Sequence, residues 1–410
     1  MKLRNDCDQI VRRAIAAVQP DAAVRRALEG ASFRSGRVVL VAVGKAAWSM
    51  AQAAYSCVGG RLDGGIVITK HGHAQGPIGS LLIREAGHPV PDQDTFSATE
   101  EALALTDGLT AEDTVLFLLS GGGSALFEAP LVPQEELQSI TQSLLASGAD
   151  IVEMNTIRKR LSAVKGGRFA QHCAPARVFS IVLSDIIGDP LDMIASGPAY
   201  PDSSTCADAR RIAEQYGLRL SPEASQCLER ETPKVLDNVE TLITGSVREL
   251  CAAASAACRE LGYEPVLLTD SLDCEAREAG AFLAAVARSH QDTERSLAFL
   301  AGGETVVHLT GSGLGGRNQE LALSAAAGIA GLEDTAVFSL GSDGTDGPTD
   351  AAGGFVDGGT KERLARQGVR IFEVLKNNDA YHALAACGGL LHTGATGTNV
   401  NDVAVLLIRR

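Results

Sequence analysis

Short apolar runs alternate along this chain with alanine-rich stretches of helical length. The run "VVLVAV" at 38–43 precedes "AAWSMAQAAYSCV", and "TVLFLL" at 114–119 precedes another helical stretch. After residue 235 the alternation resumes, and the last apolar run is "DVAVLLI" at 402–408. Strands that alternate with helices indicate βαβ units and mainly parallel sheets. Because these runs lack alternating polar residues, we expect strands that are buried on both faces.

A polar segment, "RETPKVLDN", separates two stretches of this pattern. We therefore predict an α/β protein with two α/β domains, residues 1–235 and residues 236–410, each built on a mainly parallel, Rossmann-like sheet. A chain of 410 residues agrees with two or three domains. In open α/β sheets, ligands bind beyond the carboxyl ends of the strands. The polar residues that follow each apolar run are therefore the candidates for chemistry.

Charge and cysteine content narrow the range of partners. The net charge is −14 and no long run of Lys or Arg occurs, so nucleic acid and anionic membranes are not expected partners. The nine cysteines are odd in number, scattered and without a CxxC pair, which predicts free thiols in a reducing, cytoplasmic setting. The aliphatic run at 38–43 is too short to cross a bilayer.

Two strand ends of the first predicted domain carry groups that suit an anion. Lys45 follows the run at 38–43, where an ammonium group favours a negatively charged ligand and a surface lysine is the alternative. A glycine-rich turn follows the run at 114–119. Because its glycines lack Cβ atoms, this turn could present successive N–H groups to an anion. One alternative is a strained turn without a ligand, and a less favoured one is a nucleophilic serine. Its residues are Ser120, Gly121, Gly122, Gly123 and Ser124.

A basic helix and an acidic strand end come next. Arg158 and Lys165 share one face of the stretch "NTIRKRLSAVKGGRF", where they could hold phosphates or form a solvated charged surface. Asp185 stands where the strand of "VFSIVLSD" should end, with Asp189 and Asp192 nearby. A carboxylate there could act as a general base or a Mg²⁺ ligand, and helix capping is the alternative.

In the second predicted domain, "GSGLGGR" at 311–317 has the outline of a dinucleotide-binding fingerprint. It arrives late in the chain, and no acidic residue ends the following strand. The alternative is a phosphate-binding turn through Gly315 and Gly316, with Arg317 at the helix start, because arginine forks match phosphate or carboxylate oxygens.

Two further glycine-rich loops offer oxygen and amide ligands. Asp343 and Asp346 lie in "GSDGTDGPTD", where they could position Mg²⁺ through water and phosphate or form an Asx turn. Thr398 and Asn399 lie in "TGTNVND" and suit sugar-like or phosphate oxygens, or a plain turn network. Cations, bare-backbone turns and acidic loops at strand ends together favour phosphoryl transfer, which needs positioning and charge stabilisation more than covalent chemistry.

With these motifs assembled, the chain resembles the class II glycerate kinases, the glycerate 2-kinases, whose C-terminal part is called the MOFRL domain. The resemblance spans nearly the whole chain. Arg160 stands where the family pattern has histidine, and Ala395 where it has proline. The motifs that carry the resemblance are "VGKAA", "GHPVPD", "LLSGGGSAL", "NTIRKRLSAVKGG", "LSDIIGDPLDMIASGP", "GGETVV", "GGRNQELAL", "GSDGTDGPTDAAGG", "NNDAY" and "TGTNVND".

The resemblance implies ATP-dependent phosphorylation of D-glycerate to 2-phosphoglycerate with a divalent metal such as Mg²⁺. It also implies an active-site cleft between the two domains, with Lys45 and Arg317 as the catalytic cations and Asp185 close to the chemistry. A homodimer stays open. The alternatives are an NAD(P)H-dependent hydroxypyruvate reductase and a non-catalytic sugar- or nucleotide-binding sensor.

Overall fold

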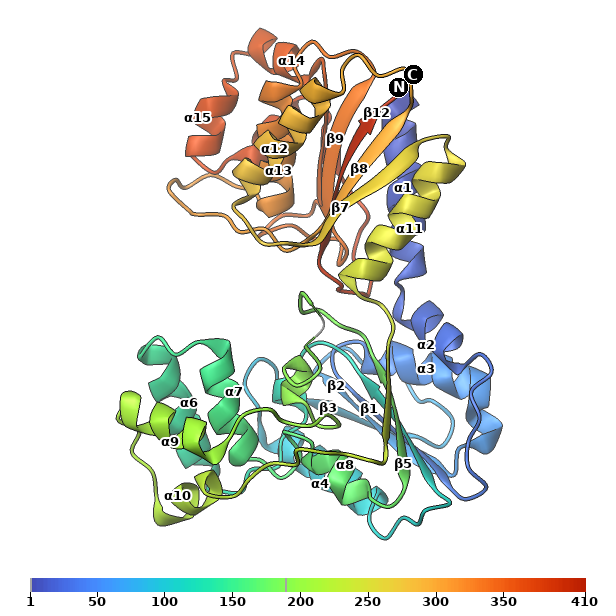
Figure 1. Ribbon diagram of the computed structural model, residues 1–410, viewed down its shortest axis with the longest axis vertical. Coiled ribbons are helices and arrows are strands. Elements are labelled where there is room, and N and C mark those ends of the chain that lie inside the picture. The colour runs from blue at the N-terminus through green and yellow to red at the C-terminus, as the bar shows by residue number, and fades with distance from the viewer. Residues whose placement is uncertain (1, 189) are drawn as a thin grey trace. The chain divides into compact units, whose positions relative to one another are not determined.

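The computed structural model describes residues 2–188 and 190–410, which form two compact units. The N-terminal unit comprises residues 23–183 and 190–244, and the C-terminal unit comprises residues 2–22, 184–188 and 245–410. Each unit is a sheet covered by helices (Figure 1). The prediction of two α/β units is confirmed.

The sheet of the N-terminal unit is entirely parallel, in the order β3-β2-β1-β4-β5-β6. Strands β1 and β4 at its centre are buried on both faces, as their unbroken apolar runs predict. From β1 the chain proceeds outward to β3, then returns and continues from β4 to β6. A ligand site is expected at the carboxyl ends of β1 and β4, where the strand order reverses. The strands are β1 Val38–Val43, β2 Gly64–Lys70, β3 Leu82–Ala86, β4 Thr114–Leu119, β5 Arg177–Val182 and β6 Val239–Ile243.

Helices cover both faces of this sheet: α3 lies on one face, and α4 and α8 on the other (Figure 1). A separate cluster of α6, α7, α9 and α10 has its own apolar core. The helices of the unit are α3 Ala47–Val58, η1 Gly59–Arg61, α4 Gln93–Leu105, α5 Gly123–Leu126, α6 Gln134–Ala146, α7 Ile151–Arg160, α8 Arg168–Cys173, η2 Ile194–Ser196, α9 Cys206–Gln215 and α10 Pro222–Leu228. The chain passes between the units within α2 Pro20–Leu28.

The sheet of the C-terminal unit is mixed, in the order β11-β10-β9-β12-β8-β7. Only β7 and β8 pair in parallel, so the prediction of a mainly parallel sheet is wrong for this unit. The last strand, β12, inserts antiparallel between β8 and β9. Strand β12 is buried on both faces, so its sequence is an unbroken apolar run that cannot be distinguished from that of a parallel strand. The strands are β7 Glu264–Leu272, β8 Leu297–Gly303, β9 Thr335–Gly341, β10 Gly353–Asp357, β11 Leu390–Leu391 and β12 Asp402–Ile408.

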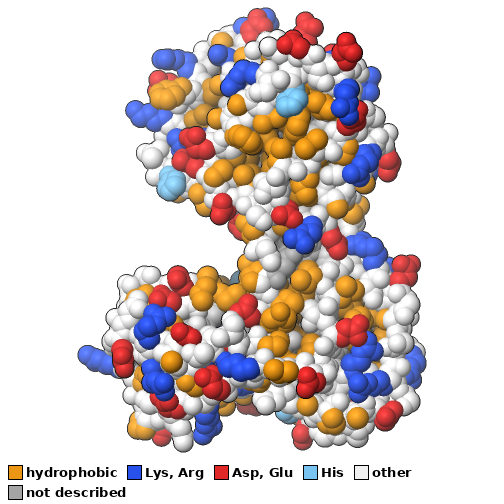
Figure 2. Space-filling view, viewed as in Figure 1, with side chains coloured by type: hydrophobic (Ala, Val, Ile, Leu, Met, Phe, Trp, Pro, Cys, Tyr) orange, Lys and Arg blue, Asp and Glu red, His pale blue; other side chains and the backbone are white. Residues whose placement is uncertain are grey.

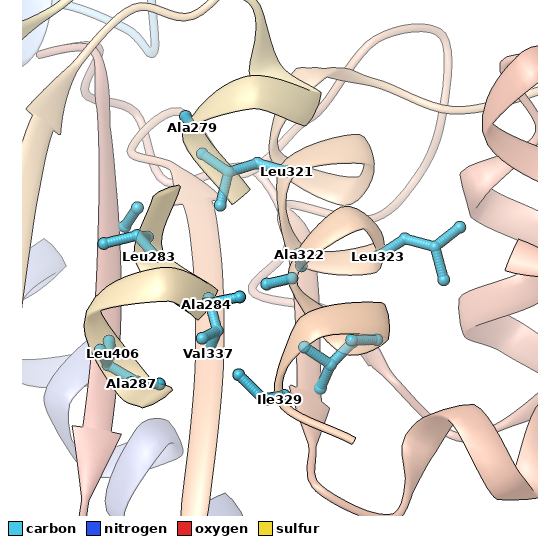
Figure 3. Packing of buried hydrophobic residues seen from close by; sticks show 14 of the residues in the cluster. Ala279, Leu283, Ala284, Ala287, Leu321, Ala322, Leu323, Ile329, Val337 and Leu406 are labelled. Atoms are coloured by element: carbon cyan, nitrogen blue, oxygen red, sulfur yellow. The ribbon is translucent and has the colours of Figure 1, made fainter. Parts of the chain in front are cut away.

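Helices α1 and α11 cover one face of the second sheet, and α12 and α13 cover the other (Figure 1). Figure 3 shows Leu283 of α12 and Leu321 and Ala322 of α13 packed over Val337 and Leu406 of the sheet. This core fixes α13, whose first residue is the predicted catalytic arginine. The helices of the unit are α1 Lys2–Ala17, α11 Val247–Glu260, α12 Ala276–Ser289, α13 Arg317–Gly328, α14 Thr360–Arg366, α15 Ile371–Lys376 and α16 Ala380–Ala386.

The division of the chain differs from the predicted boundary at residue 235 in three places. Strand β6 pairs with β5 and so belongs to the N-terminal sheet. Helix α1 packs on α11 of the C-terminal unit. Residues 184–188 also belong to the C-terminal unit, although residues 23–183 and 190–244 belong to the N-terminal unit. The polar segment that suggested a linker instead leads into an edge strand.

Over the face in view, Lys and Arg side chains are interspersed with Asp and Glu on each unit (Figure 2). In the described part of the chain, no helix is long and apolar enough to span a membrane. All nine cysteines are free thiols.

Candidate functional site

Lys45 and the glycine-rich turn lie together where the strand order of the N-terminal sheet reverses. The Lys45 N–H donates to the Gly121 carbonyl at 2.9 Å, and the Ala46 N–H donates to Ser120 Oγ at 3.1 Å. These bonds join the turn after β1 to the turn after β4. The structure thus brings together two of the sequence-predicted site segments.

Gly122 allows a close approach in this turn. Its φ is +87°, a left-handed conformation that favours glycine. A Cβ atom at this position would lie 3.2 Å from Lys45 Cγ and 3.1 Å from Cδ2 of His88. The missing side chain therefore leaves room for the lysine stem and an imidazole ring beside a bare backbone.

His88 is a site residue that sequence reasoning did not assign. It follows β3 in "GHPVPD", and its ring lies against the position of Gly122. Burial, and then the nearby charge of Lys45, lower the pKa of this histidine. A neutral imidazole beside an ammonium group can donate one hydrogen bond and accept another without adding positive charge. The signal in the sequence was its place directly after a strand.

Lys165 contacts the glycine-rich turn from the protein interior, where a ligand cannot reach it. Its side chain is fully buried, and Nζ donates to the carbonyls of Ser124 at 2.9 Å and Phe127 at 2.7 Å. It also lies 3.3 Å from the buried carboxylate of Glu128. Burial lowers the pKa of Lys165 to about 8, although Glu128 opposes the shift. The phosphate contact predicted for Lys165 is therefore corrected to a structural role.

Other polar side chains hold the same turn in place. Arg158 donates from Nη2 to the Ser124 carbonyl at 3.0 Å, so the sequence-predicted basic face is directed at the turn. The Ser124 hydroxyl lies 3.1 Å from that of Ser196, which donates to Asn155 Oδ1 at 2.9 Å. Ser124 is thus engaged within the protein, and no nucleophile–base pair surrounds it among the described residues.

Arg160 and Ala395 are the two departures from the family pattern. Arg160 is completely buried and donates to the Thr156 carbonyl and to both the hydroxyl and the carbonyl of Ser204. Ala395 is exposed. Asp192 pairs with the buried Lys159 at 3.4 Å, and Asp189 lies outside the described residues.

In the C-terminal unit, two carboxylates hold Arg317 at the start of α13. Nε and Nη2 form a fork on Asp402 at 2.6 and 3.1 Å, and Nη1 donates to Glu304 Oε1 at 2.7 Å. Burial alone would lower the pKa of the guanidinium, but Asp402 and Glu304 raise it. Sequence reasoning missed both acids, which come from the end of β8 and the start of β12.

The two aspartates of the predicted metal loop have different environments. Asp346 is only 3% exposed, and its carboxylate accepts the backbone N–H groups of Asn318 and Gln319 at 3.1 and 2.8 Å. It caps α13, so the metal contact predicted for it is not supported. Asp343 is partly exposed, and its Oδ1 accepts from Thr345 N at 2.9 Å.

A pocket of about 480 Å³ lies beside these residues. This size is in the range of small-molecule sites. Its lining places the turn at 315–316, the start of α13 and the acidic loop around one space. The lining includes Gly315, Gly316, Arg317, Asp343, Thr345 and Asp346.

The resemblance of 311–316 to a dinucleotide fingerprint is misleading. The N–H groups of Gly311, Ser312, Gly313 and Leu314 all donate to oxygens of Asn377, Asn378 or Asp379 at 2.8–3.3 Å. A pyrophosphate would need those donors. The glycines serve a close contact between two loops of the protein, so this geometry disfavours a nicotinamide site.

Of the remaining candidate residues of the C-terminal unit, some make buried structural contacts and others are exposed on the surface. Thr398 is buried and donates to the Val18 carbonyl at 2.8 Å, so its hydroxyl has a structural role. Asn399 is exposed. Asp185 belongs to this unit, and its carbonyl accepts from Asn401 Nδ2 at 3.0 Å. The same amide contacts Glu304, which links Asp185 to the partners of Arg317.

Comparisons with known proteins find relatives over nearly the whole chain. Residues 6–229 match a family described as "Domain of unknown function (DUF4147)", and residues 297–402 match the MOFRL family. The chain is 53% identical to the D-glycerate 2-kinase of Thermotoga maritima, over 98% of this chain and 97% of that protein. It is 39% identical to a protein of Agrobacterium vitis that is named as a hydroxypyruvate reductase, over 98% and 94% of the two chains.

Among solved structures, a crystal structure of glycerate kinase from Thermotoga maritima matches with a TM-score of 0.95 and 52% identity, covering 100% of both chains. A full-length relative at this identity shows common descent as well as a common fold. This chain belongs to the glycerate 2-kinase family, the class II glycerate kinases.

Proposed function

We propose that this chain transfers the γ-phosphoryl group of ATP to the 2-hydroxyl of D-glycerate, which yields 2-phosphoglycerate and ADP. The observation that carries the proposal is the state of Arg317: two carboxylates orient it at the edge of a pocket beside a helix N-terminus. The names of the relatives support the same reaction.

The bonds that form and break define what the protein must supply. The substrate hydroxyl oxygen bonds to the γ-phosphorus, the bond from that phosphorus to the bridging oxygen breaks, and ADP leaves. The hydroxyl proton passes to a base. Charge spreads over the transferring oxygens, so catalysis depends on positioned cations and donors.

Arg317 has the donors for this task. A guanidinium carries five N–H groups, and the contacts with Asp402 and Glu304 use three of them. Two N–H groups are left for phosphoryl or carboxylate oxygens. Because the fork on Asp402 fixes the plane of the group, little reorganisation is needed when charge develops.

Lys45 would supply a second cation, from the N-terminal unit. Its stem lies beside Gly122 and the His88 ring, where the bare turn lets an anion approach the main chain. Asp185 would accept the hydroxyl proton.

Mg²⁺ fits Asp343 better than Asp346. Asp343 offers a partly exposed carboxylate at the pocket, whereas donors at the start of α13 occupy both oxygens of Asp346. When bound, the metal would neutralise charge on the nucleotide phosphates. Asp343 would hold it through one carboxylate and water.

The free thiols support a cytoplasmic location. A homodimer stays a prediction, which sedimentation equilibrium would test.

The deciding experiment incubates the purified protein with D-glycerate, ATP and Mg²⁺ and follows the products by ³¹P NMR. The expected result is a 2-phosphoglycerate resonance with equal formation of ADP. In parallel, NADH and NADPH should stay unoxidised with hydroxypyruvate. Nicotinamide oxidation without ATP turnover would overturn the proposal in favour of the reductase.

A further inference from the structure

Asn401 links two parts of the C-terminal unit that are far apart in sequence. Its Nδ2 donates to the Asp185 carbonyl at 3.0 Å and to Glu304 Oε2 at 3.0 Å. The two partners are 216 and 97 residues away. An amide nitrogen has two hydrogens, so these contacts use its full donor capacity.

The position of Asn401 is built for these contacts. The residue is 3% exposed, and its backbone carbonyl accepts from Ser342 N at 3.0 Å. Its φ is +64°, a left-handed conformation that asparagine tolerates better than most residues. Its Oδ1 has no hydrogen-bond partner among the described residues, so the side chain acts through its donors.

Each partner of Asn401 leads to a residue of the proposed chemistry. Glu304 uses its other carboxylate oxygen to hold Arg317 Nη1 at 2.7 Å. The next residue in the chain, Asp402, forms the fork on the same guanidinium. The Asp185 carbonyl belongs to the segment 184–188, which is part of the C-terminal unit although residues 23–183 and 190–244 are not.

We propose that Asn401 is a positioning residue, which fixes the segment that carries Asp185 relative to the Glu304–Arg317–Asp402 cluster. The inference rests on the proposed function, because Asp185 and Arg317 are the groups that it places. Asn401 acts through these groups and touches no reacting atom. Loss of its amide would leave Glu304 with one fewer donor and the segment 184–188 without this anchor.

Two substitutions separate the side chain from the backbone. Asn401→Gly keeps the left-handed backbone and removes both donors. Asn401→Asp keeps the shape but sets a carboxylate against the Asp185 carbonyl and the Glu304 carboxylate. Misplacement of a catalytic group by about 1 Å can cost on the order of 10²-fold in rate. We expect kcat to fall on that order in both variants, with little change in the KM for either substrate.

Asn238→Ala is the matched control. The Asn238 amide also bridges two acceptors, the carbonyls of Ala170 and Ala176, but it lies at the amino end of the N-terminal sheet. This variant should lose thermal stability and keep the kcat of the wild type. It thereby reports the general cost of removing a bridging amide.

The tests use the full chain and two readouts. Hydrogen exchange followed by mass spectrometry should show faster exchange over 184–188 in Asn401→Gly and wild-type exchange there in Asn238→Ala. In a double-mutant cycle with Arg317→Lys, the fold-loss in kcat of the double variant should be smaller than the product of the two single fold-losses, because both changes disturb one cluster. Wild-type kcat and wild-type exchange in folded Asn401→Gly would overturn the inference. An inactive wild type would overturn the proposed function, while the exchange measurement would still decide the role of Asn401.

Discussion

Arg317 and Asp402 form a two-point fork, with Nε–Oδ2 at 2.6 Å and Nη2–Oδ1 at 3.1 Å. The arginine begins α13 and the aspartate begins β12, so the last strand of the chain orients the group at the start of the helix. A lysine in place of Arg317 would keep the charge and lose this geometry.

Arg317→Lys should therefore lower kcat/KM by about 10²-fold or more, which corresponds to about 2.7 kcal/mol of transition-state stabilisation. Steady-state kinetics with D-glycerate and ATP measure the effect. Arg363→Lys is the control, because Arg363 pairs with Asp357 on the same unit but lies outside the pocket. Equal kinetics for the two variants would remove Arg317 from the mechanism.

Lys45→Ala should lower kcat by roughly 10²-fold, about 2.7 kcal/mol of barrier, because a cation beside the transferring group is lost. Circular dichroism should show an intact fold. Lys361→Ala removes an exposed lysine of α14 and should leave the rate unchanged. A folded Lys45→Ala variant with the kcat of the wild type would exclude the proposed role.

The sequence predicted several of the groups that follow strands, although His88 after β3 was missed. Lys45 and Gly122 each stand just past an unbroken apolar run, and a parallel sheet brings the ends of neighbouring strands together. The turn was therefore predictable without knowledge of the rest of the fold.

The pairing of Arg317 with its two acids was not predictable in this way. Glu304 directly follows β8, so its position after a strand could have identified it as a candidate. However, Glu304 and Asp402 are 13 and 85 residues from Arg317, and nothing local links either acid to that arginine. They meet because β12 inserts between β8 and β9, a pairing that its apolar pattern does not specify. Asp343 and Asp346 likewise look equivalent in sequence, and only the approach of α13 buries one of them.

Gly122→Ala tests whether the bare turn admits a ligand. The added methyl would meet the Lys45 stem and the His88 ring at 3.1–3.2 Å in a left-handed conformation. We expect a stability loss of about 1–3 kcal/mol and a much larger loss of substrate affinity. Gly217→Ala is the control, since that glycine has a φ of +57° and open space around it. If both variants lose the same stability and bind substrate equally well, the turn at Gly122 has a structural role and does not bind a ligand.

Asp343→Asn should raise the Mg²⁺ concentration that gives half-maximal rate, because an anionic oxygen beside a hard cation becomes neutral. A Mg²⁺ titration of the initial rate at saturating substrates measures the change. The control is Asp350→Asn, which replaces an exposed carboxylate of the same loop that accepts a hydrogen bond from the Tyr381 hydroxyl. If the Mg²⁺ titration of Asp343→Asn coincides with that of the wild type, Asp343 does not hold the metal and serves only to form the turn.

Asp346 should make the stability of the protein depend on pH. Burial raises the pKa of its carboxyl to about 7, although the N–H groups of Gln319 and Asn318 oppose the shift. In the unfolded chain the pKa of an aspartate is about 3.9. Between these values the folded state binds the extra proton, so this contribution to the free energy of unfolding is greatest below about pH 4 and declines as the pH rises toward 7. Asp346→Asn carries no titrating group there. Denaturant unfolding at a series of pH values should show that the stability of the wild type relative to Asp346→Asn falls between about pH 4 and pH 7 and then levels off. A difference that stays constant or increases over this range would mean that the buried carboxyl is ionised in the folded protein, with the donors at the start of α13 outweighing its burial.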